Sequence, residues 1–351
     1  MLNVPDLATW PRLYELSFWD IAAKTFITEF TDMGVMEGRR ILITGGAGFV
    51  GSNLVGRLAD RNKILVLDNM HTGVVTNIDP HMEKIELMEL DVEDISQVDF
   101  EPDVIFHLGM YSSTPMYKEN RNLVHKVVDG TVQVLEFAKR HKANLVLASS
   151  SSIYNGHPVP QSEDMVPMVT DFYTEARLYA ERLTELYTRI FGLKATCLRF
   201  FSVYGPGERS KGRYANLVSQ FMWDLAEGRH PVVYGDGSQT RDFIYVGDVV
   251  DACVLAAESG KSGVFNVGTG TSYSINEMLK KVMAHVGKHL EPVHVDIPVS
   301  NYVMHTQADP RKAKEELGFS AKNTLDDGLR LMLGKADRES HPIEPSARGP
   351  S

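Results

Sequence analysis

A glycine-rich turn between a predicted strand and a predicted helix most constrains the fold of this chain. The apolar run 40–43 is typical of a buried strand, the turn after it carries Gly45, Gly48 and Gly51, and residues 52–59 have helical spacing. Glycines at this spacing permit a tight turn and a close approach of the backbone to a pyrophosphate, which helix amides can bind. Because the strand and the helix flank the turn, the pattern predicts a dinucleotide site; a glycine-rich turn without a ligand is the alternative.

Acidic residues lie where such a site would meet adenosine. Asp68 ends the second apolar strand, where its carboxylate can accept hydrogen bonds from both ribose hydroxyls and would repel a 2′-phosphate. Asn69 and Met70 follow, so no adjacent arginine is available to pair with such a phosphate. NAD is therefore favoured over NADP. Asp91 and Val92 end the third strand and are placed to meet adenine, although a simple turn aspartate would give the same pattern.

Predicted strands and helices alternate along the chain after this turn. The strands cover 40–43, 63–67, 84–90, 104–108, 144–148 and 195–200, and the long helices cover 122–140 and 172–191. Alternation of this kind is typical of a parallel sheet covered by helices on both faces. The sequence therefore predicts an α/β fold with a Rossmann, doubly wound parallel sheet and a smaller interleaved α/β lobe.

The chain divides into four predicted parts. They are an N-terminal extension (1–38), a Rossmann domain (39–200, completed by about 243–262), the smaller lobe (201–242 and 263–335) and a disordered tail (336–351). The extension has amphipathic character, and packing on its own protomer is the simpler reading; a dimer arm or a membrane-surface helix is the alternative. The tail is rich in serine, proline and charge, a composition typical of disorder.

Charge and cysteine content exclude several classes of partner. The 36 basic and 46 acidic residues give a net charge of −10 without a dense basic stripe, which argues against nucleic acid. Neither a membrane-spanning apolar run nor a secretion signal is evident. The two cysteines, Cys197 and Cys253, are too few for a disulfide framework or a cysteine-rich metal site. We therefore expect a cytoplasmic protein with no metal site.

A series of motifs occurs in a characteristic order between about residues 39 and 333. They lie at 44–52, 68–69, 107–108, 149–154, 173–177, 198–207, 234–243 and 265–268. With these motifs the chain resembles the extended short-chain dehydrogenase/reductase superfamily. Within it, the sequence is most similar to the NAD-dependent nucleotide-sugar epimerases and dehydratases, and closest to the UDP-glucose 4-epimerase group.

The resemblance implies a catalytic set. Tyr173 and Arg177 are four residues apart and thus on one helix face. A tyrosine ionises near pH ~10, and a neighbouring cation favours the phenolate that can act as a base. The family has a lysine where this chain has Arg177. The arginine keeps the positive charge, but its planar guanidinium has a different hydrogen-bonding geometry from a lysine ammonium. Ser150, four residues before Tyr154, matches the residue that hydrogen-bonds the reacting sugar oxygen. An ordinary surface pair and a loop-capping serine are the alternatives.

The resemblance also implies contacts for the cofactor and the substrate. The cofactor contacts are Gly45, Gly48, Phe49, Val50, Gly51, Asp68, Asn69, Asp91, Val92, Leu108, Tyr173 and Arg177. The substrate contacts are Ser150, Ser202, Asn216, Tyr234 and Arg241, with Arg241 on the diphosphate and Tyr234 over the base. Ser202 replaces a more usual asparagine, and 299–302 lacks an arginine common in the family. A solvated arginine and a core tyrosine are the alternatives.

Two serines help to separate the possible reactions. The resemblance places Asp-Glu in 4,6-dehydratases, and a glutamate as the second residue in uronate decarboxylases, where this chain has Ser151 and Ser152. Epimerisation at C4 of a UDP-glucose or UDP-galactose type of sugar, through a 4-keto intermediate, needs neither carboxylate. A dehydratase, a decarboxylase, an oxidoreductase or a non-catalytic nucleotide-binding protein are the alternatives. The helices 122–140 and 172–191, with apolar Val127, Val128, Leu183 and Leu186, resemble those that form a homodimer.

Overall fold

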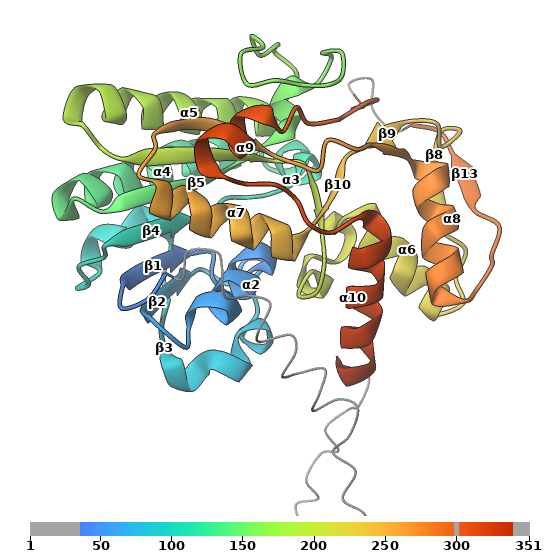
Figure 1. Cartoon of the computed structure of the whole chain (residues 1–351), viewed down its shortest axis with the longest axis horizontal. Coiled ribbons are helices and arrows are strands. Elements are labelled where there is room, and N and C mark those ends of the chain that lie inside the picture. Colours follow the sequence, from blue (N-terminus) through green and yellow to red (C-terminus); the bar gives the residue numbers. More distant parts are fainter. Residues whose placement is uncertain (1–35, 298–301, 340–351) are drawn as a thin grey trace, which may run out of the picture. The chain divides into compact units, whose positions relative to one another are not determined.

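A seven-stranded parallel sheet lies at the centre of the computed structural model, which describes residues 36–297 and 302–339 (Figure 1). The strand order is β11-β6-β5-β4-β1-β2-β3. The strands are β1 (Arg40–Thr44), β2 (Lys63–Asp68), β3 (Ile85–Glu89), β4 (Val104–His107), β5 (Asn144–Ser150), β6 (Ala195–Phe200) and β11 (Gly263–Val267). Strands β2 and β3 are added on one side of β1, and strands β4, β5 and β6 are then added on its other side. This reversal of strand order next to β1 confirms the predicted doubly wound Rossmann fold.

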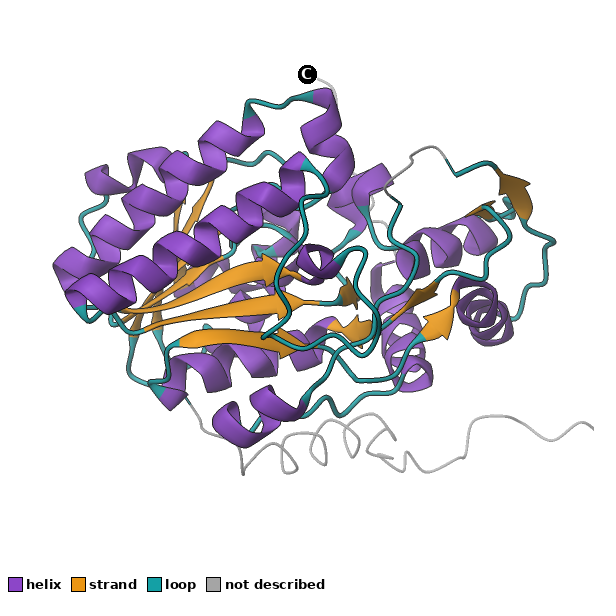
Figure 2. Ribbon diagram, turned by 90° about the horizontal axis from the view of Figure 1, so that it is seen from above, coloured by secondary structure: helices purple, strands orange, loops and turns teal. Residues whose placement is uncertain are grey.

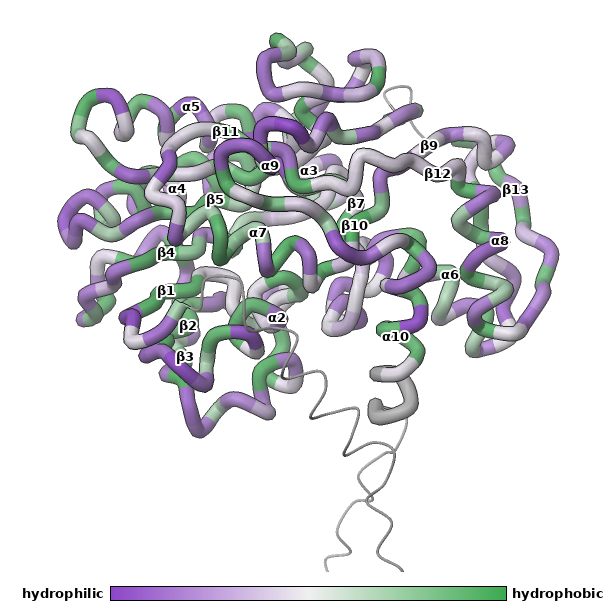
Figure 3. Tube along the Cα trace, viewed as in Figure 1, coloured by the Kyte–Doolittle hydropathy of each residue, from purple (hydrophilic) through white to green (hydrophobic). Residues whose placement is uncertain are grey.

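Helices cover both faces of this sheet (Figure 2). On one face lie α2 (Phe49–Leu58), α7 (Val246–Ser259) and α9 (Arg311–Leu317), and on the other α3 (Thr114–Glu119), α4 (Leu123–His141) and α5 (Phe172–Phe191). Successive residues of β1 serve the two faces in turn, because Ile41 and Ile43 pack with α2 and α7 whereas Leu42 packs with α4. Apolar residues accordingly follow the strands and their covering helices (Figure 3).

Local signals set the ends of the long helix α5. Asp171 caps its first turn by accepting a hydrogen bond from the backbone N–H of Thr174 at 2.9 Å, and Gly192 ends it at φ 68°. Both bounds coincide with the helix predicted at 172–191. This helix carries Tyr173 and Arg177 in its first two turns, so its start fixes where both side chains lie.

The predicted smaller lobe has its own core. It contains the strand pairs β7 (Ser202–Tyr204) with β10 (Phe243–Tyr245), β9 (Thr240–Arg241) with β12 (Tyr273–Ser274), and β8 (Val232–Tyr234) with β13 (Val293–Val295). Its helices are α6 (Leu217–Ala226), α8 (Ile275–Val286) and α10 (Leu325–Glu339). Phe221, Met278 and Leu329 are buried together in its core. Short 3-10 segments, including η4 (Ser151–Tyr154) and η5 (Arg209–Tyr214), complete the connections.

The domain bounds differ from those expected at three points. Strand β11 belongs to the large sheet rather than to the lobe, since Phe265 and Val267 are fully buried in the core beside β6 and α9. Met36 packs in that core as well, so the globular part begins before residue 39. Helix α10 continues through Glu339, into the stretch predicted as a disordered tail. Residues 1–35 and 340–351 lie outside the described residues.

Among residues 36–297 and 302–339, no helix has both the length and the apolar character needed to cross a bilayer.

Candidate active site

A cavity of about 420 Å³ opens where the carboxyl ends of the sheet strands meet the lobe. It is lined by the glycine turn, the ends of β2, β4 and β5, the first turns of α5, and segments of the lobe. Every predicted cofactor contact lines it, together with Ser150, Ser202, Asn216 and Arg241. Tyr234 does not line it: its ring lies edge-on to that of Tyr302, with 6.4 Å between the centroids.

The glycine turn is built by backbone packing that side chains would prevent. Gly45 has φ +70°, and a Cβ there would lie 2.7 Å from the Cα of Gly109. A Cβ on Gly51 would lie 2.0 Å from the carbonyl oxygen of Gly45. Helix α2 begins after Gly48 without a side-chain cap among the described residues, and its first turn has no acidic residue. Its N-terminal amides and dipole therefore face the cavity as a site for a diphosphate.

Asp68 closes the other end of this site. One carboxylate oxygen accepts a hydrogen bond from the backbone N–H of Ala47 at 3.0 Å, and the other accepts one from Met70 at 2.9 Å. Burial raises the pKa of Asp68, and these amide donors oppose that shift. A Cβ on Gly73 would lie 2.8 Å from this carboxylate, so the glycine keeps space beside it. The turn and Asp68 together fit NAD, because the amides at the start of α2 would hold its diphosphate and the carboxylate would accept hydrogen bonds from its ribose hydroxyls.

Polar residues surround the expected adenine position. The side-chain amide of Asn69 donates to Asp91 at 2.6 Å, and the ammonium of Lys126 lies 3.8 Å from Asp91 and 3.2 Å from Glu93. Lys126 and Glu93 were not predicted as site residues, and both line the cavity. Their spacing in the sequence carries no motif, because they meet only when α4 packs against the segment after β3.

Tyr173 lies in the first turn of α5 at the cavity wall. Its side chain is buried, its ring lies edge-on to Tyr117 with 5.5 Å between centroids, and its hydroxyl has no hydrogen-bond partner among the described residues. The guanidinium carbon of Arg177 lies 5.2 Å from the centre of the Tyr173 ring. The two side chains are thus adjacent and buried, which rules out an ordinary surface pair.

Arg177 binds the backbone of two neighbouring strand ends. Its Nη1 donates to the carbonyl oxygen of Ala148 at 3.0 Å, and its Nη2 donates to that of Tyr111 at 2.7 Å. Nη1 also lies 3.2 Å from the sulfur of Met110, whereas the buried Nε has no partner among the described residues. Within that part of the chain no carboxylate forms an ion pair with this guanidinium, so its positive charge remains available to neighbouring groups.

Ser150 ends β5 next to these residues. Its hydroxyl accepts a hydrogen bond from the backbone N–H of Ser152 at 3.2 Å, which starts the 3-10 segment η4. Ser150 therefore caps a loop, which was the alternative role considered for it from the sequence. It also lines the cavity. Ser151 and Ser152 line the same wall.

A buried polar network lies behind Ser150. Glu181 and Arg199 form a bidentate ion pair, with N···O distances of 2.9 and 2.7 Å. Ser149 donates to Glu181 at 2.5 Å, and Arg199 donates to the hydroxyl of Tyr154 at 2.8 Å. Because Glu181 is two turns beyond Tyr173 on the same face of α5, this network fixes the helix against the ends of β5 and β6.

His107 is a buried cavity residue that motif reasoning did not assign to the site. Burial and the charge of Arg177 lower its pKa to about 3, so the imidazole is neutral. The hydroxyl of Thr44, which accepts the backbone N–H of Gly109, forms a hydrogen bond with Nδ1 of His107 at 2.8 Å. The other ring nitrogen, Nε2, is buried and has no partner among the described residues.

The lobe contributes a cation, Arg241, to the cavity wall. Arg241 donates to the carbonyl oxygens of Thr240 at 2.8 Å and Met304 at 3.2 Å, and to that of Val303. Burial lowers the pKa of Arg241, and its guanidinium carbon lies 5.4 Å from the centre of the Tyr302 ring. Tyr302 does not line the cavity, and it contacts both Arg241 and Tyr234.

Comparison with known proteins identifies the family. The model of the NAD dependent epimerase/dehydratase family matches residues 41–268, which is more than half of the chain. The chain belongs to this family. The family is NAD-dependent, which confirms the cofactor predicted from the sequence.

Relatives within the epimerase/dehydratase family have different reactions. The putative UDP-glucose 4-epimerase of Methanocaldococcus jannaschii is 32% identical over 307 residues, covering 84% of this chain and 97% of that protein. UDP-glucuronic acid decarboxylase 3 of Arabidopsis thaliana is 34% identical over 311 residues, covering 84% and 87%. The structure of UDP-glucose 4-epimerase with UDP-glucose from Thermotoga maritima has a TM-score of 0.80 and 30% identity, covering 86% of this chain and all of that chain (100%).

Proposed function

We propose that this protein is a 4-epimerase of nucleotide-diphosphate sugars of the UDP-glucose/UDP-galactose type. The positions of the acidic residues that line the cavity, among the described residues, favour epimerisation over dehydration and decarboxylation. They are Asp68, Asp91, Glu93 and Glu208, none of which lies on β5, η4 or α5 beside Tyr173. Elimination of water or decarboxylation would need a carboxyl group at that end, and the residues there are Ser151 and Ser152. Epimerisation needs only a base and a hydroxyl that holds the sugar oxygen.

The side chains at this end suit that chemistry. NAD, held by the glycine turn and Asp68, would supply the acceptor for a hydride from C4 of the sugar and the donor for its return to the other face. Tyr173 takes the proton of the 4-hydroxyl, and the adjacent charge of Arg177 stabilises the phenolate. Ser150 hydrogen-bonds the sugar oxygen and holds it within reach of Tyr173. After the 4-keto sugar rotates to present its other face, Tyr173 returns the proton.

The lobe binds the nucleotide part in this proposal. Arg241, which has no carboxylate partner among the described residues, binds the diphosphate, and Ser202 and Asn216 line the wall beside it. The ring pair of Tyr234 and Tyr302 lies at the base.

An NMR screen of UDP-, GDP-, CDP- and TDP-sugars tests the reaction and identifies the nucleotide. We expect inversion at C4 without net consumption of NAD. Accumulation of NADH would instead indicate an oxidoreductase, and loss of water or of carbon dioxide a dehydratase or decarboxylase. Binding without any turnover would indicate a non-catalytic nucleotide-binding protein.

We also propose a homodimer through α4 and α5, which pack side by side. Tyr179, Leu186 and Ile190 are 42%, 48% and 61% exposed along α5, enough for an apolar stripe. Val127, predicted to contribute, is instead buried in the core of its own chain because it packs under α5.

Light scattering tests the dimer. We expect a mass of twice the 39.2 kDa of the chain, and a shift to the monomer for Leu186→Asp because a charge would be buried at the interface. Val232→Asp, at an apolar position of the lobe that is 42% exposed, is the control and should stay dimeric. A monomeric wild-type protein at micromolar concentration would contradict the proposal.

We also propose that the enzyme acts in the cytoplasm. Cys197 and Cys253 are both buried free thiols, which suits a reducing compartment.

A further inference from the structure

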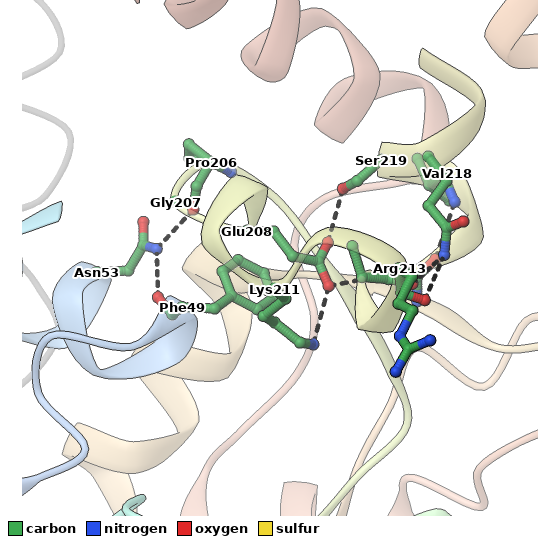
Figure 4. Close-up of polar contacts among 12 residues, drawn as sticks. Phe49, Asn53, Pro206, Gly207, Glu208, Lys211, Arg213, Val218 and Ser219 are labelled. Carbon is green, nitrogen blue, oxygen red and sulfur yellow. Dashed lines mark hydrogen bonds and ion pairs between the residues drawn. The ribbon is translucent and has the colours of Figure 1, made fainter. Parts of the chain in front are cut away.

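The segment between β7 and α6 connects the lobe to the glycine turn (Figure 4). The side-chain amide of Asn53, in α2, donates to the carbonyl oxygen of Pro206 at 2.9 Å, and also to that of Phe49 at 2.9 Å. Asn77 donates to the carbonyl oxygens of Ala47 at 3.0 Å and Gly207 at 3.3 Å. These amides hold the start of the segment against the same turn of backbone that forms the dinucleotide site.

Lys211, in η5 of this segment, brings a cation to the glycine turn. Its ammonium lies 5.4 Å from the centre of the ring of Phe49, the first residue of α2. The side chain is only 16% exposed and lines the cavity. An ammonium has three N–H donors, and among the described residues it has one acceptor, Glu208, at 3.1 Å. Two donors therefore remain for a ligand.

Glu208 holds the ammonium in this position. Its fully buried carboxylate accepts hydrogen bonds from the backbone N–H of Asn216 at 2.8 Å and the hydroxyl of Ser219 at 2.6 Å, besides that of Lys211. A buried carboxylate needs such donors, and its charge balances that of the mostly buried lysine before a ligand binds. The cation is therefore fixed by the lobe rather than free to swing into solvent.

The glycine turn lacks a cation of its own. Residues 44–52 contain no lysine or arginine, and the end of helix α2 supplies only about half an elementary charge. The other cations that line the cavity contact other parts of it: Lys126 lies beside Asp91 and Glu93, Arg177 beside Tyr173, and Arg241, proposed to bind the diphosphate of the sugar, beside Tyr302. A bound diphosphate on α2 would keep much of its charge without a further donor.

We propose that Lys211 binds the diphosphate of NAD beside the N-terminus of α2. The inference rests on the assignment of NAD to the glycine turn and extends it with a residue from the lobe. The two remaining N–H donors of Lys211 bond phosphate oxygens while the third stays on Glu208. The cofactor is then held by both parts of the chain, and the lobe segment that carries Lys211 closes over it.

Binding measurements on the full-length protein, freed of nucleotide, test this role without any sugar turnover. We expect Lys211→Met to weaken binding of NAD and of ADP-ribose by roughly 10- to 100-fold, the effect of losing a charged hydrogen bond. Affinity for adenosine, which has no phosphate, should not change. Lys211→Arg should keep most of the affinity, and added salt should weaken NAD binding less in Lys211→Met than in the wild type.

Lys261→Met is the matched control. Lys261 is exposed just before β11, at the end of the sheet opposite the cavity, so its loss should leave all three affinities unchanged. Equal NAD affinity in Lys211→Met and the wild type would overturn the inference. The inference would also be overturned if Lys211→Met weakened the binding of adenosine to the same degree, because that result indicates a structural role. It would likewise be overturned if Lys211→Met lost affinity only for UDP. A protein that binds NAD through Lys211 but epimerises no sugar would contradict the proposed reaction and leave this inference standing.

Discussion

Tyr173→Phe should all but abolish sugar turnover while the protein still folds and binds NAD. The variant loses the group proposed to accept the proton of the 4-hydroxyl, and loss of a general base costs roughly 10²- to 10⁴-fold in rate. The phenyl ring keeps the packing against Tyr117 and Arg177. Since the hydroxyl has no hydrogen-bond partner among the described residues, its removal leaves no buried group unpaired. The measurements are kcat, NAD affinity and the melting temperature.

Tyr117→Phe separates this chemical role from packing. Tyr117 contacts the ring of Tyr173, and its own hydroxyl donates to the carbonyl oxygen of Tyr111 at 3.1 Å. This control loses a hydrogen bond that Tyr173→Phe does not lose, so we expect a lower melting temperature but a rate within about tenfold of the wild type. Comparable kcat values for Tyr173→Phe and the wild type would rule out Tyr173 as the base.

The large sheet could be predicted from the sequence because its strands are buried on both faces. Runs such as those of β1 and β2 are continuously apolar, and the long helix α5 carries its own capping signals at Asp171 and Gly192. The lobe gave weaker signals, since its strands have two or three residues and pair with partners far along the chain. β11 was placed in the wrong part for the same reason: its neighbour in the sheet, β6, ends more than sixty residues earlier.

The site was predictable where function depends on a strand end or on a helix face. Asp68 and Ser150 end strands, and Tyr173 and Arg177 share one face of α5, so the fold brings them to one cavity. His107 also ends a strand, β4, so its position was predictable even though no role was assigned to it. Lys211 and Tyr302 could not be placed in this way, because they lie outside the sheet strands on segments whose course the sequence does not give. Tyr234 was predicted to lie over the base, but it does not line the cavity, and its ring contacts that of Tyr302.

We propose that Arg177 takes over the role of the family lysine. Its two terminal nitrogens donate to the carbonyl oxygens of Ala148 and Tyr111 in a planar geometry that a lysine ammonium does not reproduce. Its charge lies beside the ring of Tyr173. In this proposal Arg177 has two separable functions, an electrostatic one towards Tyr173 and a structural one towards the backbone of Ala148 and Tyr111.

Two substitutions at Arg177 should separate these functions. Arg177→Met removes the charge and leaves buried carbonyl oxygens without donors, so we expect a rate loss on the order of 10²-fold or more and a stability loss of about 1–3 kcal/mol. Arg177→Lys restores the charge but only part of the hydrogen bonding; it should keep substantial activity, with a lowered melting temperature. If Arg177→Met lowers the melting temperature but leaves the rate unchanged, Arg177 is a structural residue only, and another group must activate Tyr173.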